Sequence, residues 1–379
     1  MKILLFGEYS NVHATLARGL RRLGHEVTVV SDGDRWKAYP RDIDITRRGT
    51  GVFATLRYLW KVWRVVRSLR GYDVVQIINP MMLELKAERQ MWAYRMLRRN
   101  NKRMVMGAFG MDHYWVKAGC DCHTFRYSDF NMGSELRIYP MGETEKRDWL
   151  EGAKGRLNRL IANDCDLIVT GLYEYDASYR PHFPQKTHFI PMPIELPDES
   201  LCAPIYDGGK IRFFIGIQRT RSEYKGTDIM LRALRRLEQD YGERIEVRVA
   251  ENVPFEEYKR MLGTSHVILD QLYSYTPAMN ALLAMSCGMI VVGGGEPENY
   301  DILGESELRP IINVQPSEDD VYCQIRDRII LHPENVATLQ QQSRLYVERH
   351  HEYVQIAMRW MDMVENTDDH GVKQTQEGA

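Results

Sequence analysis

The chain contains a strand–helix–strand pattern that begins at its first residues and starts again after a proline-rich segment. The first unit runs from the apolar strand KILLFG through an amphipathic segment from Asn11 to Leu23 to the strand GHEVTVVS. Ser10 or Asn11 can cap this helix, and Gly24 can end it. Apolar strands that alternate with amphipathic helices predict an α/β fold, in which helices cover both faces of a parallel sheet.

The rest of the chain follows the same pattern. In the first half, strands are predicted at YDVVQIIN, RMVMGAFG and CDLIVTG, with helices over 52–69 and 85–99. In the second half, strands are predicted at IRFFIGIQ, RIEVRVAEN, VILDQLY, GMIVVGGG and PIINV, with helices over 227–241, 254–262 and 279–286. The segment FIPMPIELPDESLCAPIYDGG concentrates prolines, which neither helices nor central strands accept, so we place a domain linker near residues 190–208.

These features predict two Rossmann-like domains, which suits a length of 379 residues. We place the N-terminal domain at 1–195 and the C-terminal domain at 209–345. A helix over 346–366 is expected to return to the N-terminal domain, because its apolar face must be buried. That face consists of Ala357, Trp360, Met361 and Val364. The polar tail over 367–379 is expected to be disordered.

The composition, 44% hydrophobic and 27% charged residues, is that of a globular protein. No window supplies the roughly 18 consecutive apolar residues that a membrane helix requires. No secretion signal is recognisable, so we expect a cytoplasmic protein with its six cysteines reduced. Cys120, Cys122 and His123 lack a fourth ligand nearby, and we interpret them as loop or core residues; no metal site is predicted.

The charges are unevenly distributed. Residues 1–195 contain 31 Lys and Arg against 22 Asp and Glu, whereas the remainder contains 19 against 30. A basic first half predicts an anionic partner, although arginines on solvated helix faces would give the same count. We expect no nucleic-acid partner.

The segment VFATLRYLWKVWRVVRSLR combines tryptophans with five basic residues. Such a helix can lie on an anionic membrane surface, which would place the protein at the inner membrane face. The apolar stripe Phe53, Leu56, Trp63 and Val66 is equally what a sheet-covering helix needs, and we favour that interpretation.

Two loops distinguish among α/β proteins. The first, GEYSNVHAT, lacks the G-x-G-x-x-G fingerprint, so no dinucleotide cofactor is expected; a Walker lysine motif is also missing from the sequence. The second, GIQRTRSEYKGTD, follows a strand and opens a helix. Because helix N-termini, Arg and Lys bind phosphate, Arg219, Arg221 and Lys225 are candidates for a diphosphate clamp. A solvated basic loop is the alternative.

With these motifs in place, the sequence resembles the large retaining family 4 of GT-B glycosyltransferases, also called glycosyl transferases group 1. The resemblance lies in the first loop followed by GHEV, the linker strand FIPMPIE, the strand–R–KG–helix unit, and LLAMSCGMIVVGGGEPE. It extends loosely from Met1 to about Val364. It implies two Rossmann-like domains facing a cleft, with the acceptor bound by residues 1–195 and the nucleotide-sugar donor by 209–345.

The resemblance also implies site residues in the N-terminal domain. The active-site acid or histidine of the family falls near FGMDHYW, so Asp112 and His113 are the catalytic candidates, with a buried structural role as the alternative. Gly7 and His13, on the first loop, are expected on the acceptor side. The stretch from His113 to Trp149 shows no clear periodicity, and long irregular excursions are usually functional or mobile.

The donor domain departs from the family at one motif. The two positions at which the family has glutamates that hold sugar and ribose hydroxyls are Tyr275 and Leu283 in this sequence. We therefore expect the donor sugar to be held by Tyr275, by the backbone amides of Ala278 and Met279, and by Asn280, which is expected to be buried and hydrogen-bonded.

The resulting hypothesis is an enzyme that transfers a sugar from a nucleotide diphosphate to a glycan or lipid-linked acceptor. By resemblance it is retaining, and the sequence has no DxD-type metal motif, so metal-independent catalysis without a cofactor is expected. Because the glutamate pair is missing, two alternatives stay open. One is a non-catalytic GT-B subunit that binds a partner or glycan, and the other is a sugar-nucleotide epimerase.

Overall fold

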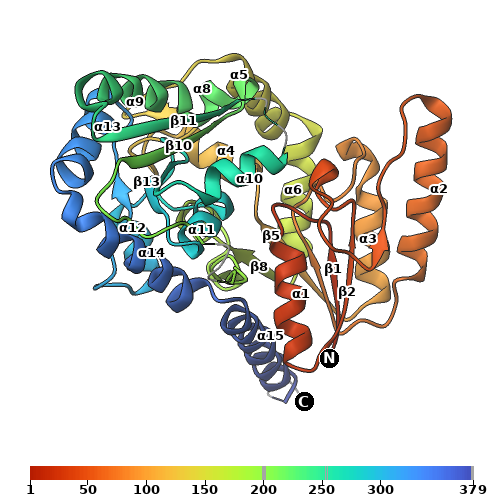
Figure 1. Ribbon diagram of the computed structural model, residues 1–379. Helices are drawn as coiled ribbons and strands as arrows, with labels where there is room; N and C mark the ends of the chain where they lie inside the picture. Colours follow the sequence, from red (N-terminus) through yellow and green to blue (C-terminus); the bar gives the residue numbers. More distant parts are fainter. Residues whose placement is uncertain (199–201, 252, 254, 377–379) are drawn as a thin grey trace.

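A computed structural model describes residues 1–198, 202–251, 253 and 255–376. The chain forms two parallel β-sheets, each covered by helices, which lie side by side (Figure 1). We call the parts built on the first and the second sheet the N-terminal and C-terminal domains. This arrangement confirms the predicted pair of α/β domains with parallel sheets.

The N-terminal sheet has seven strands in the order β3-β2-β1-β4-β5-β8-β9, all parallel. These strands are β1 (Lys2–Phe6), β2 (Glu26–Ser31), β3 (Ile43–Asp44), β4 (Val74–Ile77), β5 (Arg103–Ala108), β8 (Leu167–Thr170) and β9 (Thr187–Phe189). The helices are α1 (Val12–Arg22), η1 (Arg35–Lys37), α2 (Val52–Ser68), η2 (Ala87–Arg89), α3 (Met91–Asn100), α4 (His113–Cys120), α5 (Pro140–Lys146), η3 (Arg147–Glu151), α6 (Ala153–Asp164) and α7 (Tyr173–Tyr179). A short hairpin joins β6 (Asn131–Met132) to β7 (Glu135–Leu136).

The C-terminal sheet has five parallel strands in the order β11-β10-β12-β13-β14. These are β10 (Ile211–Ile217), β11 (Ile245–Glu251), β12 (Val267–Leu269), β13 (Ile290–Gly293) and β14 (Ile312–Asn313). The helices are η5 (Arg219–Arg221), α8 (Ser222–Lys225), α9 (Thr227–Tyr241), α10 (Phe255–Gly263), α11 (Met279–Ser286), α12 (Pro297–Leu303), α13 (Glu318–Ile325), η6 (Arg326–Ile330), η7 (Pro333–Asn335), α14 (Val336–His351) and α15 (Tyr353–Gln376).

The central strands explain why the sheets form. Every residue from Ile3 to Phe6 in β1 is fully buried, as is every residue of β4. Strands buried on both faces read as continuous apolar runs, which is the pattern of parallel sheets covered by helices. None of the helices in the described residues combines the length and apolar character needed to span a bilayer.

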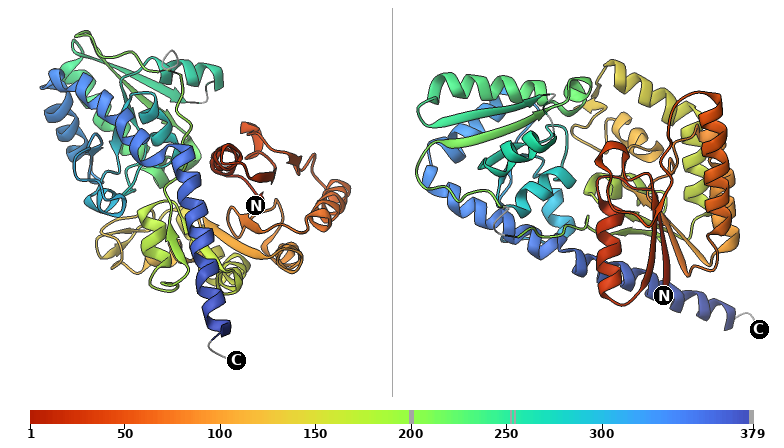
Figure 2. Two further views of the ribbon diagram at one scale, coloured as in Figure 1. Left: turned by 90° about the horizontal axis from the view of Figure 1, so that it is seen from below. Right: turned by 45° about the vertical axis from the view of Figure 1, so that its right-hand side comes forward.

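The final helix crosses from the C-terminal domain back to the N-terminal domain, as predicted (Figure 2). Glu352 lies between α14 and α15 and caps α15 by accepting hydrogen bonds from two backbone N–H groups. Gly19 of α1 permits the close approach of α15, because a Cβ there would lie 2.5 Å from the Tyr353 carbonyl oxygen. The tail expected to be disordered from residue 367 continues α15 to Gln376, since its polar residues contain no proline that would end the helix; residues 377–379 lie outside the described residues.

The predicted linker follows β9 and precedes β10. Its backbone is tied to the C-terminal part of the chain, because the Ile194 N–H donates to the His351 carbonyl and the Ala203 N–H donates to that of Cys287. Residues 199–201 of this segment lie outside the described residues. The linker thus runs against α14 and the end of α11.

A buried hydrogen-bond chain joins α15 to the N-terminal sheet. The indole N–H of Trp360 donates to Gln76 Oε1 over 2.6 Å, and the Gln76 amide donates to His13 Nε2 over 3.0 Å. Trp360 is 1% exposed. We therefore expect Trp360→Ala to lower the free energy of unfolding by about 3–5 kcal/mol, since it leaves a cavity and removes the donor to Gln76.

Denaturant unfolding followed by circular dichroism measures this effect. Met358→Ala is the matched control, because Met358 lies on the same helix but is 53% exposed. The control should change stability by less than about 0.5 kcal/mol. Equal stability of the Trp360→Ala variant and the wild type would show that the docking of α15 does not stabilise the N-terminal domain.

Candidate functional site

The stretch between β5 and α6 shows no clear periodicity in the sequence. In the structure it forms α4, the β6–β7 hairpin and α5. The buried Asn131 side chain holds the hairpin together by donating to the carbonyl oxygens of Phe125 and Gly133. This stretch belongs to the N-terminal domain, yet several of its side chains reach the C-terminal domain. It therefore forms one wall of the interface between the two domains.

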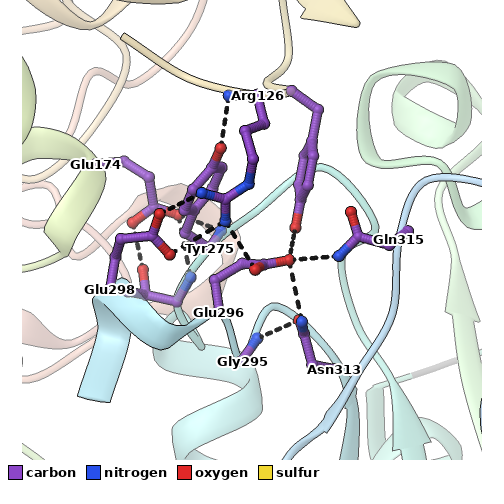
Figure 3. Close-up of polar contacts among 10 residues, drawn as sticks. Arg126, Glu174, Tyr275, Gly295, Glu296, Glu298, Asn313 and Gln315 are labelled. Atoms are coloured by element: carbon purple, nitrogen blue, oxygen red, sulfur yellow. Dashed lines mark hydrogen bonds and ion pairs between the residues drawn. The ribbon is translucent and has the colours of Figure 1, made fainter. Parts of the chain in front are cut away.

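Arg126, on this wall, meets two carboxylates of the C-terminal domain (Figure 3). Its guanidinium donates to Glu296 Oε2 over 2.8 Å and to both carboxylate oxygens of Glu298. The bond to Glu298 raises the pKa of Arg126. Burial alone would raise the pKa of Glu298, but the bonds from Arg126 outweigh burial and lower it. The three charges form one interdomain ion cluster.

Glu296 is 4% exposed and accepts hydrogen bonds from both domains. Besides Arg126, its donors are the hydroxyl of Tyr127 at 2.5 Å, the amide of Asn313 at 3.0 Å and the amide of Gln315 at 2.7 Å. A buried carboxylate is stable only when its oxygens are paired in this way.

Glu174, from α7 of the N-terminal domain, binds the turn that precedes α11 (Figure 3). Its carboxylate accepts from the backbone N–H of Tyr275 at 2.7 Å and of Thr276 at 3.1 Å, and from the Thr276 hydroxyl. Burial raises the pKa of Glu174. The sequence has no carboxylate in this turn, and the N-terminal domain supplies one from outside it.

Tyr275 was predicted to contact the donor sugar, but its side chain is 2% exposed and packs within the interface. Its ring stacks on Tyr173 at 5.7 Å and lies against Tyr127 at 5.0 Å, with the Arg126 guanidinium 4.9 Å from its centroid. Its hydroxyl accepts from the Arg126 backbone N–H. An aromatic ring gains free energy when it is buried against other rings, which explains why Tyr275 lies inside the interface.

The basic loop lies where the sequence placed it, between the end of β10 and the start of α9. Arg219 is exposed and pairs with Glu251, whereas Arg221 and Lys225 have no ion-pair partner among the described residues. Gly226 has φ +71°, and a Cβ there would lie 2.6 Å from Leu272. This close approach brings the loop onto the segment that follows β12.

The donor turn is the neighbour of this loop. β10 and β12 are adjacent strands, and the Leu272 N–H donates to the Lys225 carbonyl over 2.9 Å. Ala278 is the N-cap residue of α11 and Met279 its first residue. Asn280 was expected to be buried; it is exposed, because the first turn of α11 faces outward, and its amide donates to Asp270 over 2.9 Å. The structure therefore holds the predicted donor loop against the segment that leads into the predicted donor turn.

The first loop has a structural role. Gly7 has φ +88°, and a Cβ there would lie 2.4 Å from Ile78, so the turn after β1 requires glycine. His13 was predicted on the acceptor side but is fully buried, with Nδ1 2.8 Å from the Gly7 carbonyl; burial lowers its pKa to about 3. Glu8 accepts from the N–H groups of His13 and Ala14 and thus occupies the anion position at the N-terminus of α1.

Asp112 and His113, the catalytic candidates, are likewise used inside the N-terminal domain. Asp112 is fully buried and caps α4 by accepting from the Trp115 N–H at 2.9 Å, and Tyr179 donates to its other oxygen. Burial raises its pKa to about 7. His113 donates from Nδ1 to the Trp149 carbonyl, and burial lowers its pKa. Both residues thus make structural contacts at the start of α4, as the structural alternative predicts.

Sequence reasoning missed four residues of the interface: Arg126, Glu174, Glu296 and Glu298. The last two lie in GGGEPE, a motif that supported the family resemblance, so that motif was the available signal. Arg126 lies in the excursion that we expected to be functional or mobile. No local pattern distinguishes Glu174 from other helix carboxylates.

No group of three or more His, Cys, Asp or Glu side chains able to hold a metal ion occurs in the part of the chain that the structure describes. Cys120 and Cys122 are free thiols, and the backbone N–H of His123 is bonded to Asp121.

One family profile matches part of the chain. The profile described as "Glycosyl transferase 4-like domain" matches residues 8–119, from the loop after β1 to the end of α4. A comparison with curated protein sequences gives no match.

Solved structures resemble the chain over nearly its full length. A sucrose-phosphate synthase from Thermosynechococcus elongatus has a TM-score of 0.60 and 14% identity, covering 97% of this chain and 100% of that chain. HepE from Anabaena, solved in complex with UDP and glucose, has a TM-score of 0.61 and 13% identity with the same coverage. WaaG, a glycosyltransferase involved in lipopolysaccharide biosynthesis, has a TM-score of 0.53 and 13% identity, covering 96% of this chain and 99% of that chain. The chain therefore matches the glycosyl transferase 4-like profile over residues 8–119 and has the two-domain GT-B fold of these solved structures.

Proposed function

We propose that the protein is a glycosyltransferase that moves a sugar from a nucleoside diphosphate to a glycan or lipid-linked acceptor. The observation that carries the proposal is the contact of the basic loop 219–226 with Leu272, three residues before the turn 275–280, at the carboxyl ends of adjacent strands. Open α/β sheets bind ligands at this edge. Bound UDP and glucose in HepE, which shares the fold, support a nucleotide-sugar donor.

The basic loop 219–226 can stabilise the negative charge that develops in such a reaction. When the bond between the sugar and the phosphate breaks, negative charge accumulates on the departing diphosphate. Arg219, Arg221 and Lys225 and the backbone N–H groups at the start of α9 would stabilise that charge. The amides of Ala278 and Met279, with the Asn280 side chain, would contact the sugar.

The proposed reaction is retaining and metal-independent. The acceptor hydroxyl forms the new bond to the anomeric carbon on the face from which the diphosphate leaves, and its proton passes to a phosphate oxygen of the leaving group. This route needs no protein base, which agrees with the structural roles of Asp112 and His113. Lysine and arginine side chains would take the place of a metal ion at the diphosphate, and no further cofactor is required.

A second function has a specific observation in its favour. Glu174 holds the backbone N–H groups of Tyr275 and Thr276, at the start of the turn proposed to hold the sugar, and Arg126 links the domains across the same region. A non-catalytic GT-B subunit would keep this closed arrangement. Hydrolysis of a panel of nucleotide sugars separates the two: turnover supports the transferase, and binding without turnover, with or without acceptors, supports the subunit.

The acceptor and the cellular location belong to the same proposal. The protein is proposed to work in the cytoplasm, at the inner face of a membrane, with the acceptor bound by the N-terminal domain. That domain has the surplus of basic residues, which suits an anionic acceptor or lipid surface.

Lys225→Ala tests the diphosphate clamp. Since a charge-assisted hydrogen bond contributes about 1.5–3 kcal/mol, we expect UDP affinity to fall by roughly tenfold or more. Isothermal titration calorimetry measures it. Arg235→Ala is the matched control, because Arg235 is an exposed basic residue farther along α9. Unchanged affinity in Lys225→Ala and Arg219→Ala variants would place the diphosphate elsewhere.

Asp112→Asn separates a helix cap from a catalytic acid. The asparagine keeps an acceptor for the Trp115 N–H, so we expect activity within about threefold of the wild type, since little hydrogen bonding is lost. Because burial raises the pKa of Asp112 to about 7, the folded state holds the proton more tightly, and the wild-type free energy of unfolding falls as the pH rises from about 4 to 7.

The asparagine variant should lose this part of the pH dependence, so its stability relative to the wild type should increase across that range. Unfolding at several pH values, together with steady-state transfer, measures both effects. Abolished transfer in a folded Asp112→Asn variant would restore Asp112 as a catalytic residue.

A further inference from the structure

Helix α2 carries two apolar faces, and only one of them is covered. Tyr58, Val62 and Val66 are buried against the N-terminal sheet. Residues on the opposite side are exposed: Val52 73%, Phe53 89%, Leu56 58%, Trp60 58% and Trp63 41%. The favoured prediction from the sequence, that the stripe of Phe53, Leu56, Trp63 and Val66 covers the sheet, is confirmed only for Val66, because Tyr58 and Val62 form the rest of the buried face.

The exposed residues form one continuous face. Phe53, Leu56, Trp60 and Trp63 are spaced by three, four and three residues, so they lie on one side of a helix with 3.6 residues per turn. Large apolar side chains in such an array on a protein surface mark an interaction site. The helix lies at the outer edge of the N-terminal domain, away from the C-terminal domain (Figures 1 and 2).

The surroundings of this face are basic. Residues 45–72 contain seven Arg and Lys and no Asp or Glu; Asp44, directly before them, pairs with Arg48 and Lys61. The Arg64 guanidinium lies 4.6 Å from the Trp60 ring, and that of Arg67 lies 5.0 Å from the Trp63 ring. Positive charge therefore sits directly beside the exposed indoles, in the arrangement that amphipathic helices use at the boundary between lipid headgroups and acyl chains.

We propose that α2 is a membrane-docking helix that lies in the surface of a bilayer rich in anionic lipids. The apolar face enters the boundary between headgroups and acyl chains, and Arg57, Arg64 and Arg67 bind lipid phosphates. This inference deepens the proposed location but does not depend on sugar transfer, because it concerns a surface separate from the donor loops.

A bilayer fits this surface better than a second copy of the chain. Two copies meeting through α2 would bring their basic residues together without acidic side chains between them, which is unfavourable. A bilayer offers both an apolar phase for the aromatic rings and negative charge for the arginines.

The experiment is flotation of the full chain with vesicles of pure phosphatidylcholine or of phosphatidylcholine with phosphatidylglycerol. We expect binding to the anionic vesicles, with a blue shift of tryptophan emission. The double variant Phe53→Ala/Trp60→Ala should lose apolar insertion, and Arg57→Glu/Arg64→Glu should bind anionic vesicles at least roughly tenfold more weakly, since each basic residue contributes about 1 kcal/mol at such a surface.

Leu345→Ala is the matched control, because Leu345 is 50% exposed on α14 of the other domain. Melting temperature and UDP binding without vesicles are measured for every variant, so a failure of membrane binding is distinguished from a failure of donor binding. No binding to either vesicle, equal binding by the wild type and both α2 variants, or concentration-dependent dimers that these variants abolish would overturn the proposal.

Discussion

The carboxylate of Glu296 is almost completely buried, and neither domain alone satisfies it. Its four donors come from Arg126 and Tyr127 of the N-terminal domain and from Asn313 and Gln315 of the C-terminal domain. A buried charge without partners costs several kcal/mol, so the separation of the domains would have to hydrate or re-pair this group. This contact therefore favours the packed arrangement of the two domains.

The position of the donor turn follows from the same interface. Once Arg126 and Tyr127 are held against Glu296, the ring of Tyr275 lies between them and Tyr173, and Glu174 reaches the backbone of Thr276. The turn is thereby fixed next to the basic loop. Glu174 holds the N–H groups of Tyr275 and Thr276, and Ala278 and Met279, whose amides are proposed to contact the sugar, follow directly after them.

Two further helices border the N-terminal domain, and their apolar faces differ: that of α15 is buried, whereas one face of α2 is exposed. On one side α15 is held by the buried chain from Trp360 through Gln76 to His13, which excludes water. On the other side α2 leaves a basic, aromatic face uncovered. A helix that covers a sheet needs a single apolar stripe, so the second stripe of α2 calls for a partner outside the chain.

From the sequence alone, the alternation of apolar strands and amphipathic helices determined the two parallel sheets, and the helix bounds at α9 and α11 were predicted to the residue. The basic loop was also predictable, since Arg219, Arg221 and Lys225 lie between a strand and a helix. The roles of Asp112, His13 and Asn280 could not be predicted from the sequence, because burial and hydrogen-bond partners depend on how elements distant in sequence pack. The interface of Arg126, Glu174 and Glu296 was decided only by the tertiary structure, since its hydrogen bonds, such as Arg126 to Glu296 and Tyr275 to Glu174, join residues more than 100 positions apart, and a carboxylate becomes an interdomain contact only where folding brings its donors.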